Sequence, residues 1–222
     1  MLSKFYGNHQ NLRYFFLLAI LLGALGISMF LAVSMGSVQI SLSDTYRIIL
    51  SKMGAPLDIG DLSKSTLAIV WNMRLPRVFL ALIVGAGLSM CGSVMQSTVN
   101  NPIAEPYVLG ISAGATFGAT LSIILGFKVM IGLGSFLGAL VATVAVLVIA
   151  SMQGRMTTSS LILSGTVVNA LFLAFSNFII SIGANADSVM TIKFWTMGSL
   201  AGISWAHLTL PAVVVGIAFL FF

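Results

Sequence analysis

Long apolar runs, each bounded by a few polar or charged residues, repeat along most of this chain. Residues 14–36 form the first of these runs and carry no charge. A helix rises ~1.5 Å per residue and the hydrocarbon core of a bilayer is ~30 Å thick, so this run can cross a membrane once. It is too long for the apolar region of a signal peptide and lacks a convincing small-residue cleavage site. The pattern predicts a retained transmembrane helix.

The segment 37–73 differs from the runs around it because charged residues and a Gly-Ala-Pro break interrupt it. Ser43 and Asp44 are suited to cap a short helix that runs to Lys52. The apolar side chains of this helix are expected to lie along the membrane surface: Tyr46, Ile49 and Leu50. We interpret the segment as an extramembrane connection and not as a second domain.

Further apolar runs predict five more spans and one half-helix. The predicted spans are 78–104, 106–127, 129–154, 156–186 and 205–222, with the half-helix at 188–200. The run at 156–186 is long enough to require tilt or a part outside lipid. Short loops favour antiparallel packing of neighbouring spans. The expected fold is an all-α polytopic transmembrane helix bundle, a single domain of about six spans plus a half-helix over residues 1–222.

Composition supports this interpretation. Of the 222 residues 59% are hydrophobic and 7% are charged, whereas soluble domains carry about 25% charged residues. The net charge of +5 is spread thinly, without the basic stripe of a nucleic-acid-binding protein, and the single cysteine excludes a disulfide framework. Membrane lipid is therefore an expected partner, and nucleic acid is not.

Glycines recur at four-residue spacing in two of the predicted spans. Small residues at this spacing let transmembrane helices approach closely. The expected packing residues are Gly110, Gly114 and Gly118 in one span, and Gly134 and Gly138 in the next.

The sequence is poor in groups that could carry chemistry. It has no metal-binding or cofactor motif, no catalytic Ser/His/Asp set and no phosphate-binding loop, so neither enzymatic activity nor a bound cofactor is expected. No Asp, Glu or His lies in the middle of a predicted span, which disfavours a proton-coupled transporter or an ATP-independent channel. If a solute passes through this protein, the free energy comes from another subunit.

Two arginines at the start of the second span are candidates for a binding role. Arg74 and Arg77 are three residues apart and are expected to lie on one face of a helix. Their side chains could reach lipid phosphates, as arginines at the ends of spans often do. They could equally hold carboxylates of a partner protein in two bidentate sites.

Three motifs in the middle of the chain are specific. RLPR at 74–77 is followed by NPIAEP at 101–106 and LGISAG at 109–114, and LILSG at 161–165 and FWTMGSL at 194–200 agree with them. Together they resemble the FecCD-type permeases, the membrane subunits of binding-protein-dependent ABC importers for iron-siderophores, haem and vitamin B12. The resemblance extends from about residue 12 to residue 222.

The resemblance implies a ten-helix permease of the bacterial inner membrane, paired with a second copy or a paralogue. It also implies two cytoplasmic ABC ATPase subunits and an extracytoplasmic substrate-binding protein. Arg74 and Arg77 match the arginines that meet acidic residues of the binding protein. The cytoplasmic gate would include Asn101, Ile103, Thr158 and Ser159.

The residues of the translocation path are harder to place. The fifth span and the half-helix after it would line the path. Polar residues of the fifth span are therefore our candidates: Asn169, Ser176 and Asn177. The expected function is import of an iron chelate, most simply a siderophore complex, by alternating access. The family's chains continue for roughly another third, so the alternative is a truncated, transport-inactive fragment of such a permease.

Charge distribution and resemblance disagree on orientation. The family's cytoplasmic N-terminus would place three cations inside: Lys4, Arg13 and Arg155. Seven would then face outward: Arg47, Lys52, Lys64, Arg74, Arg77, Lys128 and Lys193. The positive-inside rule favours the opposite orientation. We follow the resemblance, because a docking surface for an acidic partner itself requires outward arginines.

Overall fold

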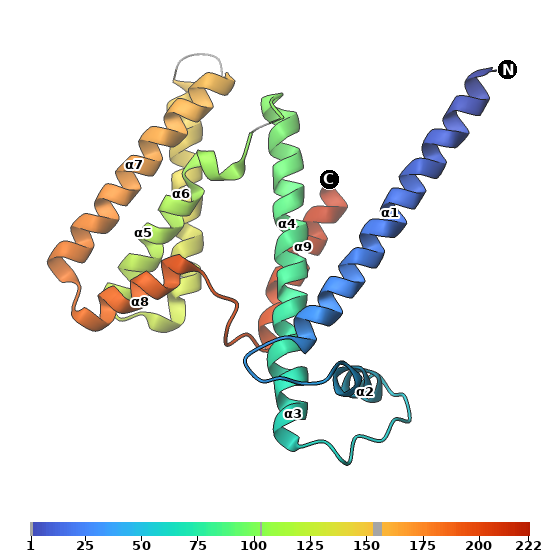
Figure 1. Ribbon diagram of the computed structural model, residues 1–222. Coiled ribbons are helices and arrows are strands. Elements are labelled where there is room, and N and C mark those ends of the chain that lie inside the picture. The colour runs from blue at the N-terminus through green and yellow to red at the C-terminus, as the bar shows by residue number, and fades with distance from the viewer. Residues whose placement is uncertain (1, 103, 153–156) are drawn as a thin grey trace. The chain divides into compact units, whose positions relative to one another are not determined.

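A computed structural model describes residues 2–102, 104–152 and 157–222, and in these ranges the chain is helical, without strands (Figure 1). The chain divides into two compact units, Met1–Gly85 with Leu200–Phe222, and Ala86–Ser199. One helix, α4 (Leu75–Val99), begins in the first unit and ends in the second. The two units are described separately.

The first unit combines long helices with several short ones. Its elements are α1 (Leu2–Ser34), α2 (Leu42–Lys52), α3 (Lys64–Ala68), the π-helix η1 (Ile69–Arg74), the start of α4, the 3-10 helix η4 (Trp205–Leu208) and α9 (Thr209–Phe221). The short helix predicted in the connection is confirmed as α2. Its N-cap is Ser41 and not Ser43 or Asp44, because the Ser41 hydroxyl accepts a 3.0 Å hydrogen bond from the Asp44 amide.

The helix that leads into the second predicted span begins much earlier than residue 78. It starts at Lys64, where the Ser63 hydroxyl accepts from the Thr66 amide, and continues through η1 into α4. The prediction was wrong here because Arg74 and Arg77 were taken to mark the start of the helix. Charges mark where a helix leaves the hydrocarbon, but they do not stop its backbone hydrogen bonding.

The second unit is built around three packed helices. Its elements are the end of α4, the 3-10 helix η2 (Pro106–Leu109), α5 (Ile111–Ile124), the 3-10 helix η3 (Lys128–Met130), α6 (Ile131–Ser151), α7 (Thr158–Gly183) and α8 (Ala186–Met197). The predicted half-helix is confirmed as α8. It is capped by Asn185, whose side chain accepts from the Ser188 amide, and it ends at Gly198 with φ +74°.

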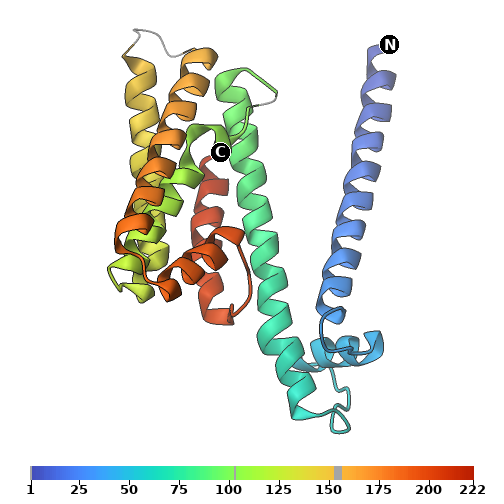
Figure 2. The same cartoon turned by 60° about the vertical axis from the view of Figure 1, so that its left-hand side comes forward.

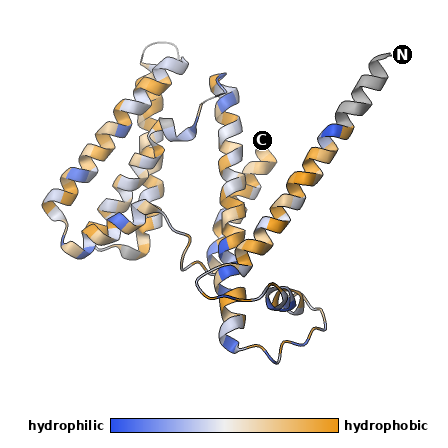
Figure 3. Ribbon diagram, in the orientation of Figure 1, coloured by the Kyte–Doolittle hydropathy of each residue, from blue (hydrophilic) through white to orange (hydrophobic). Residues whose placement is uncertain are grey.

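Four helical segments are long and apolar enough to cross a membrane: Leu12–Ser34, Lys64–Val99, Ile131–Ser151 and Thr158–Gly183. Two shorter apolar helices, Ile111–Ile124 and Trp205–Phe221, occupy the other two predicted spans. Large apolar side chains are exposed along the long helices, as lipid-facing surfaces require. Hydrophobic residues predominate in these helices (Figure 3). The chain is therefore an integral membrane protein with an all-α fold.

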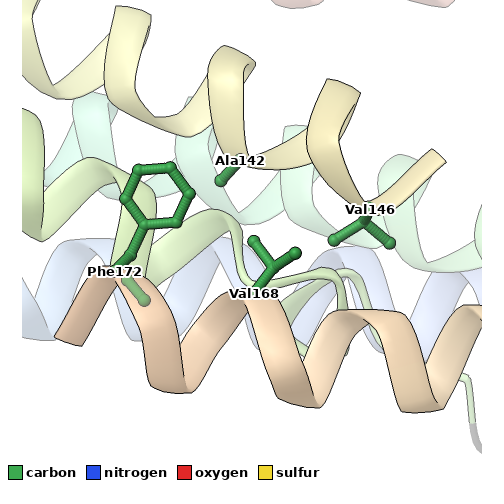
Figure 4. Packing of buried hydrophobic residues seen from close by; sticks show 5 residues of the cluster. Ala142, Val146, Val168 and Phe172 are labelled. Atoms are coloured by element: carbon green, nitrogen blue, oxygen red, sulfur yellow. The ribbon is translucent and has the colours of Figure 1, made fainter. Parts of the chain in front are cut away.

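The core of the second unit lies between α5, α6 and α7. Ala142 and Val146 of α6 face Val168 and Phe172 of α7 (Figure 4). Phe117 of α5 closes this cluster with its ring centroid 5.4 Å from that of Phe172. The cluster holds α7 against the α5–α6 pair.

Glycine packing between α5 and α6 is confirmed for four of the five predicted residues. A Cβ added to Gly114 or Gly118 would overlap the carbonyl group of Gly138 or Gly134 respectively, so the two backbones are in direct contact. The fifth glycine, Gly110, also lies close to a neighbouring helix backbone, but to a different one. It is the N-cap of α5 with φ +68°, and it packs against the backbone of α7 instead of α6.

The α5–α6 contact gives a direct test of this packing. Gly118→Ala should destabilise the fold by about 1–3 kcal/mol, since the added methyl group must push the two helices apart. Unfolding in mixed micelles, followed by circular dichroism, measures the change. The matched control is Gly132→Ala on α6, where an added Cβ has no atom within 4 Å. Equal stability of the two variants would contradict the assignment.

Candidate functional site

Arg74 lies inside the first unit and not on its surface. It is the last residue of η1, and only 8% of it is exposed. Its Nη1 donates hydrogen bonds to the backbone carbonyls of Val33 at 2.9 Å and Ser34 at 2.6 Å, and its Nη2 donates to the Val38 carbonyl.

These contacts explain why an arginine is buried here. The last carbonyls of a helix have no amide partners within the helix, and they form the negative end of its dipole. The last turn of α1 has no basic residue of its own, so Arg74 supplies both the donors and the positive charge. The path of the guanidinium also explains Gly36, because a Cβ there would lie 2.7 Å from the Arg74 Nη2.

The predicted arginine pair is therefore divided. Arg77 is exposed, whereas the Arg74 guanidinium is occupied by the end of α1. The expectation that both side chains share one free face is wrong for Arg74. The reason is tertiary: a helix end that needs donors lies next to it, and helical spacing within one element cannot show this.

The π turn leaves one backbone carbonyl open, and this carbonyl has a specific partner. Pro76 has no amide hydrogen, so in the i→i+5 pattern of η1 the Trp71 carbonyl has no backbone donor. The indole Nε1 of Trp205 donates to this carbonyl at 2.9 Å. The Trp205 ring also lies against Trp71 and Phe79, with centroids 5.5 and 5.7 Å away. The start of η4 is thus fixed to η1.

The two predicted gate segments meet in the second unit. The Thr158 hydroxyl, at the start of α7, donates a 2.9 Å hydrogen bond to the carbonyl of Val99, the last residue of α4. Asn101 lies two residues after Val99, and Ser159 follows Thr158 with an exposed side chain. Ile103 lies outside the described residues.

A polar hollow adjoins this contact on the α4 side. It has a volume of about 460 Å³ and is lined by Ser93, Gln96, Ser97, Asn100, Asn101 and Pro102. Asn100 adopts φ +52°, a left-handed conformation that asparagine tolerates, and this turns the chain sharply after α4. The segment predicted to gate the path is therefore a tight polar turn.

The three path candidates on α7 have different environments. Asn177 is exposed and Asn169 is half-buried. Ser176 is 2% exposed, and its hydroxyl donates to the Phe172 carbonyl of its own helix at 2.8 Å. The prediction is wrong for Ser176, because a buried and satisfied hydroxyl has no free face to offer a solute.

A second hollow was not predicted. It has a volume of about 630 Å³, lies between α5 and α8, and is lined mainly by hydroxyl and aromatic side chains: Ser112, Ala115, Thr116, Thr191, Phe194, Trp195, Thr196, Gly198 and Ser199. The sequence contained a signal for it. Ser112 and Thr116 are four residues apart, as are Thr191 and Trp195, so each pair lies on one helix face.

One ion pair orders the connection between α2 and α3. Arg47 of α2 donates to both carboxylate oxygens of Asp61, at 3.0 and 2.8 Å, and to the Asp58 carbonyl. The hydrogen bond from Arg47 lowers the pKa of Asp61, and the same bond raises the pKa of Arg47. In the part of the chain that the structure describes, no three His, Cys, Asp or Glu residues are grouped as a metal site.

Comparisons with known proteins identify the class. The FecCD transport family matches residues 18–222, so the chain belongs to this family. It is an integral protein of the inner membrane, as the members of this family are.

Individual relatives agree with the family assignment. The ABC transporter permease protein YvrB of Bacillus subtilis is 34% identical over 86% of this chain and 56% of its own length. The cobalamin import permease BtuC of Halobacterium salinarum is 38% identical over 75% of this chain and 45% of its own length. The ferric enterobactin permease FepG of Escherichia coli is 32% identical over 71% of this chain and 48% of its own length. The chain spans about half the length of these relatives.

A solved structure shares the fold. It is an ABC transporter assigned to the metal-chelate type in an inward-facing conformation, with a TM-score of 0.61 and 27% identity. The match covers 82% of this chain and 53% of that one.

The indole hydrogen bond of Trp205 leads to a stability prediction. Trp205→Phe keeps an aromatic ring beside Trp71 and Phe79 but leaves the Trp71 carbonyl without its donor. We expect a loss of about 1 kcal/mol in unfolding free energy, measured by denaturant titration in micelles. The control is Trp195→Phe, whose indole makes no hydrogen bond to the described residues. A loss no larger than that of the control would contradict the role of the indole.

The Arg47–Asp61 pair predicts a dependence on pH. Because the folded-state pKa of Asp61 is lowered, the pair stabilises the connection above the ordinary aspartate pKa of about 4 and is lost as the pH falls through the lower folded value. Amide exchange at residues 58–63, corrected for intrinsic rates, should rise below about pH 4 in the wild type. In Asp61→Asn it should already be fast at neutral pH. Identical pH profiles for the two proteins would refute the prediction.

Proposed function

We propose that this chain acts as a permease subunit of a binding-protein-dependent ABC importer, which moves a metal chelate across the inner membrane by alternating access. The observation that carries the proposal is the family match, which includes all of the RLPR, NPIAEP and LGISAG motifs. The permease itself is not an enzyme in this proposal, and separate cytoplasmic ATPase subunits hydrolyse ATP.

The contact between α4 and α7 supports a gate at this point. Thr158 and Val99 are 59 residues apart in sequence, yet the Thr158 hydroxyl bonds the Val99 carbonyl at the end of α4. One hydrogen bond of this kind is weak enough to break and re-form when helices move. We place the cytoplasmic gate at this contact, with Asn101 and Ser159 beside it, and keep Ile103, which lies outside the described residues, as a gate candidate from the sequence.

The hollow between α5 and α8 supports a path for a bulky, polar solute. Its hydroxyl and aromatic lining offers hydrogen bonds and apolar contact without charge. A lining of this kind binds weakly, as a path that must release its solute requires. Asn169 and Asn177 on α7 are further candidates for the path.

Two of the relatives support the choice of substrate class. Their names give cobalamin and ferric enterobactin, both metal chelates, as what they import, and the solved structure is assigned to the metal-chelate type. We place an iron-siderophore complex first, with haem and cobalamin as alternatives. Uptake of radiolabelled ferric siderophores and of cobalamin by cells with the complete transporter separates them.

Docking of the binding protein is assigned to Arg77 alone. Its exposed guanidinium is free to pair with a carboxylate, whereas that of Arg74 is used inside the fold. The proposal places this face outside the cytoplasm, and it pairs the permease with a second copy or a paralogue.

Charge reversal at Arg77 tests the proposal. Arg77→Glu should weaken binding of the substrate-binding protein to the reconstituted transporter by tenfold or more, about 1.4 kcal/mol, and should reduce uptake of the chelate. Lys64→Glu is the matched control, since Lys64 is another exposed cation of the same unit. Unchanged affinity and uptake in Arg77→Glu would remove the docking assignment.

A further inference from the structure

The short helix α2 presents an apolar stripe that the protein covers only in part, at Ile49, which packs against the cluster of Val33, Ile48, Val70 and Leu75. Leu42, Tyr46 and Ile49 of α2, with Met53 at its C-cap, fall within about 60° of one another around the helix axis. Leu42, Tyr46 and Met53 are 52%, 54% and 74% exposed, and Ile49 is half-buried. We call these four residues the α2 stripe.

The inner face of α2 fixes its position along the membrane normal. Thr45 and Ile48 are completely buried, and Ile48 clusters with Val33 in the last turn of α1 and with Val70 of η1. Because α1 is a membrane span that ends at Ser34, α2 lies at the level where that span leaves the hydrocarbon.

The polar side of α2 is already occupied. Arg47 bonds Asp61 and the Asp58 carbonyl and lies 3.8 Å from Asp44. This side therefore faces the α2–α3 connection, and the stripe is the surface that remains for a partner.

The orientation of α2 is that of a helix in the membrane plane. It runs across the direction of α1 and α3, as two views show (Figures 1 and 2). Its 11 residues, about 16 Å of helix, are too short to cross a hydrocarbon core of ~30 Å.

Exposed apolar side chains recur along the link from the span to α2. Leu31 near the end of α1, then Met35 and Val38 in the link, are 41%, 72% and 49% exposed, and Leu42 follows at the start of α2. No charged residue lies between Leu31 and Leu42, although the uncharged polar residues Ser37, Gln39 and Ser41 are exposed among the apolar ones.

We propose that α2 is an interfacial helix whose stripe inserts into the boundary between lipid headgroups and acyl chains at the C-terminal end of α1. The occupant of the stripe is lipid. Apolar residues on one face and charges on the other suit this boundary, and a tyrosine there keeps its hydroxyl in the headgroup layer. Lys52, exposed at the end of α2, is placed to meet lipid phosphate.

Insertion of the stripe would stabilise the site beside it. The cluster of Val33, Ile48, Val70 and Leu75 joins α2 to the end of α1 and to η1, where Arg74 makes its hydrogen bonds. Lipid that holds α2 at the interface thereby also holds the Arg74-capped end of α1 and the first turn of α4 at a fixed depth.

Spin-label accessibility tests the proposal. Single cysteines replace Tyr46, Met53 or Ser43 in a Cys91→Ser background, and the labelled chain is reconstituted in phosphatidylcholine nanodiscs. Ser43 is the matched control, because it is exposed on α2 but lies outside the stripe. A label at Leu22 in α1 calibrates contact with the hydrocarbon.

Labels at Tyr46 and Met53 should collide more with oxygen than with a water-soluble nickel chelate, and the label at Ser43 should show the reverse. Tyr46→Asp should abolish the preference for oxygen at Met53. Equal access of the nickel chelate to positions 43, 46 and 53 would overturn the proposal. So would a water-exposed position 46 that becomes protected only when a binding protein is added, since the occupant would then be protein.

Discussion

The C-terminal end of α1 presents backbone carbonyls where the chain leaves the hydrocarbon, and much of the first unit depends on how they are satisfied. Arg74 reaches them from a position 40 residues later in the chain. A buried guanidinium is tolerated because three carbonyls accept from it and because the helix dipole favours a cation at this end. The link after α1, the glycine at 36 and the start of α4 are all arranged around this side chain.

The π turn solves a related problem on the other side of the same segment. Pro76 removes one amide donor, and the wide turn leaves the Trp71 carbonyl open to the indole of Trp205. A cation of η1, Arg74, thus satisfies the end of α1, and the indole of Trp205 satisfies the Trp71 carbonyl three residues before that cation. The RLPR motif therefore has a structural role through its first arginine and its proline, while its second arginine stays on the surface.

In the second unit the controlling constraint is close packing. Gly114 and Gly118 let α5 contact the α6 backbone, and the Ala142–Phe172 cluster then holds α7 against the pair. Only with α7 in this place does Thr158 reach the end of α4. The polar turn that carries Asn101 owes its position to glycines and apolar residues that have no chemistry of their own.

The apolar runs, the glycine spacing and the three motifs were sufficient to predict an all-α membrane protein, the family, α2, α8 and glycines at close helix contacts. These features are local, since each depends on the periodicity or spacing of neighbouring residues. The environment of Arg74, the burial of Ser176 and the partner of Trp205 could not be obtained in this way. Each depends on which distant backbone group or helix face lies beside the residue, and in a membrane an unpaired polar group strongly favours any partner within reach. The sequence by itself determined the fold class and most of the segments that enter lipid, because long apolar runs are local. The tertiary structure alone decided that the second long helix begins at Lys64, which polar side chains are used inside the fold and which remain for a partner.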